Sequence, residues 1–139
     1  MAIKRYFADA DNTITNAYKA DLSTRATGAN MGAADVLEVF SIYGQASGTT
    51  EQLSSELSRA LIKFPVSDIQ TDRSSSVIPR SGSVSFYLKL FNARHTSTVP
   101  KDMVIMAHAL TRSWQEGTGL DMESYTDLTY GKAGSTWTF

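Results

Sequence analysis

Few residues of this chain have side chains that could do covalent chemistry, and they lie far apart in the sequence. The chain has no cysteine, which excludes disulfides, thiolate metal sites and cysteine nucleophiles. Its two histidines, His95 and His108, stand in different segments, and neither belongs to a nucleophile elbow. His108 lies on an apolar stretch, which is typical of a core histidine, whereas the surroundings of His95 are typical of a loop. We therefore expect no catalytic residues and no enzymatic activity.

Oxygen ligands for a hard cation are grouped at two places in the sequence. The first group, Asp9, Asp11 and Asn12, lacks the glycine at the sixth position and the terminal glutamate of an EF-hand loop. A second acidic cluster comprises Asp121, Glu123 and Asp127. Both groups are more typical of turns and solvated loops than of metal sites. We expect no metal site, and structural calcium is the one cofactor that these groups leave open.

Aromatic residues towards the end of the sequence could bind a carbohydrate, because exposed aromatic faces can stack on sugar rings. The candidates are Trp114, Tyr125, Tyr130 and Trp137. The competing interpretation is that both tryptophans pack in the core or at its rim, and it is the one we favour. Glycan binding is therefore kept as an alternative function that requires these rings to be exposed.

The size and charge of the chain limit the classes of function open to it. With 139 residues and a mass of 15.2 kDa, it has the length of one domain, residues 1–139. A formal net charge of −1 favours neither nucleic acid nor an anionic membrane as the partner. The longest apolar stretch, Met103–Ala107, is five residues long, which is too short to cross a membrane. Asp9 and Asp11 interrupt the first apolar stretch, so we expect a soluble protein without a signal peptide.

The elements that must position these residues are predicted to be strands, because the apolar residues alternate. The alternation is clearest over Ser83–Phe91, where Val84, Phe86 and Leu88 share one face. The stretch Met103–Leu110 is apolar on both faces, which predicts a strand buried on both sides.

Shorter apolar runs predict four further strands, at Val36–Tyr43, Ser58–Phe64, Ile3–Ala8 and Asn12–Tyr18. The last two are separated by a turn predicted at Asp9–Asn12, and polar loops are predicted at Gly44–Glu56 and Ser67–Gly82. Several short strands joined by polar loops indicate an all-β fold, with an antiparallel β-sandwich or a jelly roll as its architecture.

Five short motifs follow one another in a characteristic order. They are Ala8–Ile14, Asn30–Val39, Ser58–Val66, Trp114–Gly119 and Ser135–Trp137, with the predicted strand Ser83–Phe91 between the third and the fourth. This order resembles the DNRLRE-type domain, a β-sandwich related to carbohydrate-binding modules and found in phage virion and cell-surface proteins. The chain departs from the family at Pro65, where an aspartate is usual, and the family continues beyond its Thr-Trp pair.

The resemblance implies a sandwich whose last strands are missing from this sequence, which would leave one sheet edge open. An open edge invites another strand, so we expect the sandwich to be completed by further chain or by a neighbouring subunit. The family's hosts then imply a structural virion protein of a tailed bacteriophage, either a capsid decoration (cement) protein or a tail appendage. Such a protein is expected to be a homo-oligomer that contacts other virion proteins, such as the capsid or tail protein, without nucleic acid or membrane. The expected interface residues are Tyr87, Phe91 and Phe139, and the alternative is a carbohydrate-binding module for a cell-surface glycan.

Overall fold

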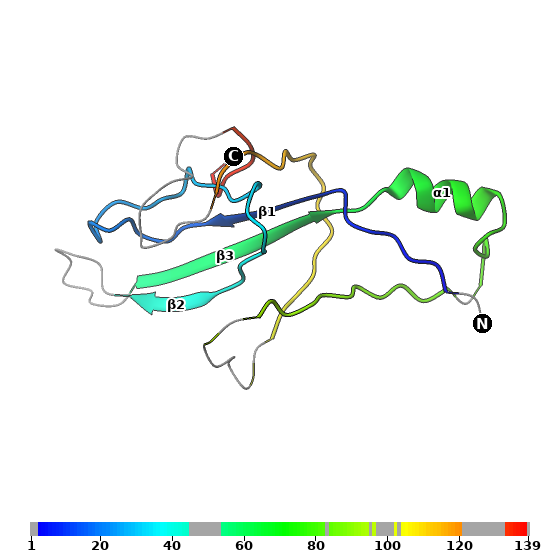
Figure 1. Ribbon diagram of the computed structural model, residues 1–139, viewed down its shortest axis with the longest axis horizontal. Helices are drawn as coiled ribbons and strands as arrows, with labels where there is room; N and C mark the ends of the chain where they lie inside the picture. Colours follow the sequence, from blue (N-terminus) through cyan, green and yellow to red (C-terminus); the bar gives the residue numbers. More distant parts are fainter. Residues whose placement is uncertain are drawn as a thin grey trace.

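The regular elements of the protein are antiparallel strands and one short helix (Figure 1). The computed structural model describes residues 3–44, 54–82, 84–94, 96, 102, 104–120 and 133–138. Within these ranges the elements are β1 (Ala10–Thr15), β2 (Ser41–Gly44), β3 (Ser54–Lys63) and α1 (Val66–Ser74). The sheet has the order β1-β3-β2, with both outer strands antiparallel to the long central β3. The regular structure is thus mostly sheet, as the apolar alternation predicts.

Strand β3 is the element that the sequence predicts best. It contains most of the predicted strand Ser58–Phe64 and extends it to Ser54, so its first residues replace part of the loop predicted at Gly44–Glu56. Strand β1 pairs with it from Ala10 opposite Lys63 to Thr15 opposite Ser58. β1 therefore begins inside the stretch predicted as a turn, because pairing with a long neighbouring strand outweighs the turn preference of aspartate and asparagine.

The outer edge of β1 is occupied by other parts of the chain. Ile14 forms an isolated antiparallel bridge with Asn30, and the amide of Met31 donates to the carbonyl oxygen of Thr13 at 3.1 Å. Further along the edge, the amide of Asp11 donates to Glu116 Oε1 at 2.9 Å. These contacts use backbone groups that a further strand would need for pairing.

Strand β2 is shorter than the strand predicted over Val36–Tyr43, and a serine side chain explains the difference. Ser58 Oγ accepts a hydrogen bond from the amide of Phe40 and donates one to the carbonyl oxygen of Glu38, both at 2.8 Å. The amide of Glu38 donates to Thr13 Oγ1 at 3.1 Å. Side-chain oxygens thus bind backbone groups that a regular ladder would pair with another strand.

Helix α1 lies where a polar loop is predicted, beyond the end of β3 (Figure 1). Pro65 precedes its first turn, Asp68 lies in the first turn and Arg73 in the last, an arrangement that favours a helix at both ends. None of its residues is buried. The helix has no apolar stripe, so a search for apolar periodicity could not detect it.

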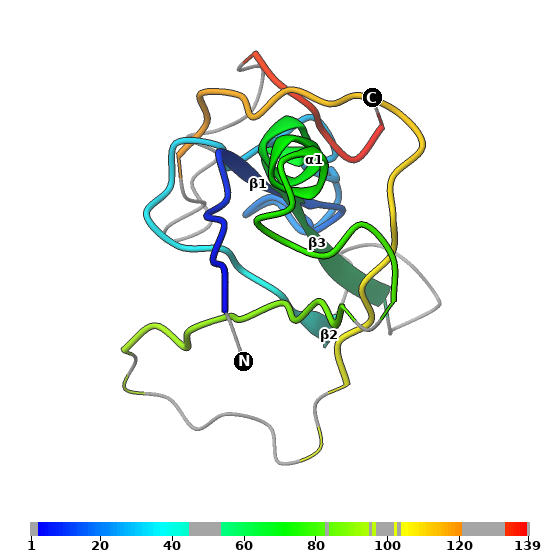
Figure 2. The ribbon, with the colours of Figure 1, turned by 90° about the vertical axis from the view of Figure 1, so that its right-hand side faces the viewer.

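The largest difference from the sequence prediction concerns residues 84–91 and 104–110. Within the described chain neither forms a strand; both run as irregular chain at the periphery of the molecule (Figure 2). Residues 104–110 are exposed throughout, which corrects the prediction of burial on both sides, and Ile3–Ala8 is also irregular. An alternating pattern makes a strand possible, but the ladder needs a neighbouring strand, and the described residues supply none here.

The buried residues cluster around β1 and the loop that follows it. Buried hydrophobic residues in the described part are Ile14, Ala17, Ala26, Ala29 and Met31. The largest fully buried side chains are polar, namely Asn12, Asn30, Thr13 and Thr15. The core is therefore small and held by hydrogen bonds as much as by apolar packing.

Candidate functional site

Two exposed apolar segments are the most prominent feature of the molecular surface. We call residues 84–91 the first apolar segment and residues 104–110 the second. Of the seventeen large hydrophobic residues that are exposed in the described chain, nine lie in these two segments. They are Phe86, Tyr87, Leu88, Leu90, Phe91, Val104, Ile105, Met106 and Leu110. Such a concentration is typical of a surface that binds another molecule.

Both faces of the first apolar segment are open. Tyr87 is 88% exposed and Phe91 is 81% exposed, and the alternate residues Phe86 and Leu90 are exposed as well. The ammonium group of Lys89 lies 4.7 Å from the centre of the Phe91 ring, which is a cation–π distance. A strand in a folded sheet normally has at least one covered face, so this segment has more exposed apolar surface than an edge strand does.

Two buried asparagines fix the chain at the end of the second segment. Asn12 Oδ1 accepts from the amide of Met31 at 2.9 Å, and its Nδ2 donates to the carbonyl oxygen of Ser135 at 2.9 Å. Asn30 Oδ1 accepts from the amide of Gly119 at 2.9 Å, and its Nδ2 donates to the carbonyl oxygen of Ala133 at 3.1 Å. We call Asn12, Asn30 and their partners the asparagine junction.

Glycines let the chain pass close to these amides. Gly117 has a φ of +87°, and a Cβ atom there would overlap the side-chain oxygen of Asn30. At Gly119 a Cβ atom would overlap the backbone carbonyl of Asn30. Both positions therefore require glycine, the first because of its φ and its contact, the second because of its contact alone. The junction thus holds residues 117–119, which follow the second apolar segment.

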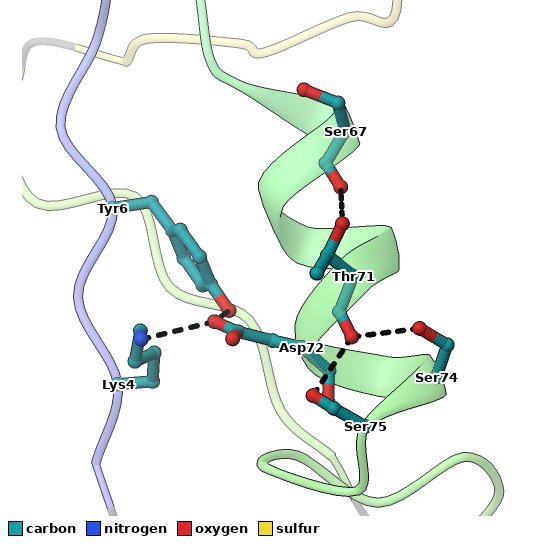
Figure 3. A network of polar contacts seen from close by, with 7 residues as sticks. All are labelled: Lys4, Tyr6, Ser67, Thr71, Asp72, Ser74 and Ser75. Carbon is teal, nitrogen blue, oxygen red and sulfur yellow. Dashed lines mark hydrogen bonds and ion pairs between the residues drawn. The ribbon is translucent and has the colours of Figure 1, made fainter.

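A second polar network holds the chain before the first segment (Figure 3). The hydroxyl of Tyr6 donates to Asp72 Oδ2 at 2.6 Å, and Lys4 Nζ lies 3.1 Å from the same oxygen. The amide of Ile78 donates to the carbonyl oxygen of Asp72 at 3.2 Å. We call Lys4, Tyr6 and Asp72 the α1 latch, because they fasten the N-terminal segment to the helix. The two apolar segments therefore lie between two polar anchor points.

The latch changes the acidity of its two acidic members. The hydrogen bond to Asp72 raises the pKa of Tyr6 to about 12 from 10.0. The same hydrogen bond, together with the one from Lys4, lowers the pKa of Asp72. The neutral phenol and the charged carboxylate are thus the forms that the folded state favours.

Acidic groups at the asparagine junction do not form a metal site in the described residues. Burial, and then the charge of Glu116, raises the pKa of Asp11. Asn12 is fully buried, and both polar atoms of its amide bind backbone groups, so it is not available as a calcium ligand. Across the described ranges, no group of three or more histidine, aspartate or glutamate residues could hold a metal ion.

The structure places the predicted interface and glycan residues in different surroundings. Tyr87 and Phe91 are exposed on the first apolar segment, whereas Trp114 and Trp137 are half-buried. The guanidinium of Arg59 lies 4.2 Å from the centre of the Trp137 ring, so one face of this indole is already covered. Residues Phe139, Tyr125, Tyr130, His95, Asp121, Glu123 and Asp127 lie outside the described residues.

One histidine corrects the sequence prediction, and the polar contacts of Asn12 and of Tyr6 were not foreseen. His108 is exposed on the second apolar segment and is not a core residue. The sequence indicated Asn12 as a turn residue, with a cation ligand as the alternative, and it gave no indication of the contact between Tyr6 and Asp72, which are 66 positions apart. The Asn30-Met-Gly32 motif was the available signal for the asparagine junction, because a glycine near a buried asparagine permits close backbone approach.

No known protein family, curated protein or solved structure matches this chain. The helix in the described residues is also neither long nor apolar enough to cross a membrane.

Proposed function

We propose that this chain is a non-enzymatic structural protein that works by associating with other protein subunits. The observation that carries the proposal is the large apolar side chains that the described residues expose. Seventeen large hydrophobic residues are exposed there, whereas five hydrophobic residues are buried. Exposed apolar surface in such concentration is typical of a protein that binds another molecule.

Burial of these side chains against another protein would be favourable, because burial of apolar area stabilises an assembly by about 25 cal/mol per Å². By associating with another subunit, the chain would remove from water as much apolar surface as a stable domain does.

The virion of a tailed bacteriophage is the assembly that we propose, with the chain as a capsid decoration protein or a tail appendage. A β-sandwich or jelly roll, completed by a neighbouring chain, is the architecture that belongs to this proposal. Support comes from the motifs that resemble the DNRLRE-type domain. Four of the five motifs contribute to the asparagine junction, namely Ala8–Ile14, Asn30–Val39, Trp114–Gly119 and Ser135–Trp137. The fifth motif, Ser58–Val66, contains Arg59, which covers one face of the Trp137 ring.

Mass spectrometry of purified particles tests this function. Peptides of the chain should be recovered from phage particles made in producing cells, in many copies per particle, and the isolated chain should bind to particles that lack it. A chain that is abundant in the cell lysate and absent from the particles would contradict the proposal.

Carbohydrate binding is the other outcome of the test. A monomer that binds a polysaccharide saturably, and loses this binding on Trp114→Ala while it keeps its fold, would identify a glycan-binding module in place of a structural protein. The covered face of Trp137 does not favour this outcome.

A further inference from the structure

We infer that the free edge of strand β3 is a docking site for an extended, acidic strand of another protein subunit. The free edge is the side of residues 59–63 that faces away from β1. The inference rests on the proposed structural role, and it names where a partner is held and which kind of segment the partner contributes. A strand that joins a sheet edge gains main-chain hydrogen bonds, and its side chains set the specificity.

The register of the sheet shows which backbone groups of β3 are unpaired. The amide of Asn16 donates to the carbonyl oxygen of Leu57 at 3.2 Å, so Leu57 and every second residue after it bond towards β1. The backbone groups of Ala60 and Ile62 therefore point to the opposite edge. Within the described chain they make no hydrogen bond there. Each of these residues thus offers an N–H and a C=O group to a further strand.

Strand β2 does not cover this edge, because it pairs only with the first part of β3 (Figure 1). Its pairing ends with Ser41 opposite Leu57, and the amide of Ser58 then donates to the carbonyl oxygen of Phe40 at 3.1 Å. The ladder stops there, since Ser58 Oγ binds the amide of Phe40 and the carbonyl oxygen of Glu38. The serine that shortens β2 therefore also leaves the rest of the β3 edge without a neighbouring strand among the described residues.

The charges beside the edge favour a partner with carboxylates. Arg59 and Lys63 lie at the two ends of the edge, and both side chains are exposed. Lys63 Nζ is 3.8 Å from Asp9 Oδ2, and no carboxylate in the part of the chain that the structure describes pairs with Arg59. Opposite charges directly across a strand pair are stabilising. The edge therefore favours a strand that has carboxylates four positions apart and uncharged residues between them.

A second copy of this chain is a poorer partner at this edge. The antiparallel register that joins Ala60 of one copy to Ile62 of another brings Arg59 opposite Lys63. Like charges directly opposite one another destabilise a strand pair. Charged residues on an edge protect many sheets from pairing with their own copies, and Arg59 and Lys63 have this effect here.

Hydrogen exchange of the full chain, followed by NMR, tests the inference with a peptide probe. The probe is a capped strand peptide with the core Glu-Val-Thr-Val-Glu, and the matched control peptide has lysine in place of both glutamates. The amides of Ala60 and Ile62 should exchange rapidly in the free chain and about tenfold more slowly, or slower still, with the glutamate peptide in excess. The amides of Arg59 and Leu61, which bond towards β1, should change little. The lysine peptide should bind about tenfold more weakly.

Substitutions at the edge check that its backbone and its charge both bind the peptide. Ile62→Pro removes an N–H group that has no partner in the described chain, and proline is tolerated where an edge strand faces solvent. This variant should bind the glutamate peptide about tenfold more weakly, whereas the control Ile62→Val keeps the N–H group and should bind as the unaltered chain does. Lys63→Glu leaves the backbone unchanged and should reduce or reverse the preference for the glutamate peptide. Circular dichroism and urea unfolding verify that each variant has kept its fold.

Three results would overturn the inference. The first is slow exchange of the Ala60 and Ile62 amides in the free, dilute chain, because the chain's own residues then cover the edge. The second is protection of these amides that grows with the concentration of the chain alone, which would identify a second copy as the occupant. The third is equal binding of the two peptides, or binding of neither. A chain that gives any of these results and is still abundant in particles would refute the docking edge alone and leave the proposed function standing.

Discussion

At the scale of single residues, the molecule depends on two amides and one carboxylate. Asn12 and Asn30 are fully buried, and each binds a backbone N–H and a backbone C=O from distant parts of the chain. Asp72 does similar work at the surface, where it accepts from Tyr6 and pairs with Lys4. A buried amide that binds one donor and one acceptor cannot be replaced by a smaller side chain without removing a hydrogen bond from each of them.

Replacing Asn12 by alanine should destabilise the fold by about 1–3 kcal/mol, because the carbonyl of Ser135 loses the hydrogen bond from Asn12 Nδ2. The amide of Met31 loses Asn12 Oδ1 as an acceptor and keeps the carbonyl oxygen of Thr13 at 3.1 Å. Urea unfolding measures the loss. Gln70→Ala, at an exposed position of α1, is the control and should change the free energy of unfolding little. Equal effects of the two substitutions would contradict the role given to Asn12.

The phenol of Tyr6 should titrate above the ordinary pKa of a tyrosine. Its pKa is raised to about 12 by the hydrogen bond to Asp72, from 10.0 in an unperturbed tyrosine. Because the folded value is the higher one, the latch is intact below pH 10 and its contribution to stability is lost as the pH rises towards 12. Ultraviolet titration of the chain against Tyr6→Phe isolates this group, and Asp72→Asn should return its pKa towards 10.0.

The carboxylate of the latch gives the opposite dependence at low pH. The pKa of Asp72 is lowered by the bonds from Tyr6 and Lys4, so its contribution is present above the ordinary value of 3.8 and is lost as the pH falls through the lower folded value. A latch that withstands pH values well below that range, or a Tyr6 pKa unchanged by Asp72→Asn, would contradict this account.

At the scale of elements, glycines decide where chain segments can cross. Residues 117–119 run against the side chain and backbone of Asn30, and the amide of Thr118 donates to the carbonyl oxygen of Ala133 at 3.1 Å. This crossing joins the loop after β1 to the segment that follows the second apolar segment. The position of that segment therefore depends on the absence of side chains at two glycines.

Alanine substitutions at two glycines with similar φ angles distinguish the cost of backbone strain from the cost of steric overlap. Gly82 has a φ of +94° and open space where a Cβ atom would stand, whereas a Cβ at Gly117, with a φ of +87°, would overlap Asn30. Gly82→Ala should cost about 1–2 kcal/mol from backbone strain alone. Gly117→Ala should cost about 1–3 kcal/mol more, because overpacking is added. Thermal or urea unfolding of both variants measures the difference, and equal losses would show that the crossing is loose.

The sequence predicts elements to different degrees, and the reasons are physical. The Ser58–Phe64 strand is confirmed in β3, because a run of alternating residues met a partner on each side. Helix α1 was missed, since its signals are Pro65, Asp68 and Arg73 at its ends and not an apolar face. Tyr87 and Phe91 were named as interface residues; the structure shows both side chains exposed, and their role in an interface stays a prediction. The bonds of Asn12 and Tyr6 were not predictable, because they join residues that only the tertiary fold brings together.

At the scale of the whole molecule, the described residues bury few hydrophobic side chains and expose many. The small core around β1 contains five buried hydrophobic residues in the described chain, and four of its largest buried side chains are polar. The free energy of folding of an isolated chain should therefore be low for its length. Stability and association are then linked, since any partner that binds only the folded chain raises its apparent stability.

The melting temperature should accordingly depend on protein concentration. For a self-associating chain we expect a rise of about 2–5 °C for each tenfold increase in concentration, because mass action favours the folded oligomer. Differential scanning calorimetry at several concentrations measures it. Tyr87→Ser/Phe91→Ser should melt at a temperature that no longer varies with concentration, and a constant melting temperature for the unaltered chain would contradict the linkage.

The covered edge of β1 limits the number of partners that this subunit can join through its sheet, a number that polymer chemists call the functionality of a unit. A unit that joins through both edges of its sheet is bifunctional and can form a fibre without end. Here Asn30, Met31 and Glu116 already occupy one edge. Edge pairing between such units stops after one step, so assembly through the sheet gives a closed pair, and only a different surface could extend it.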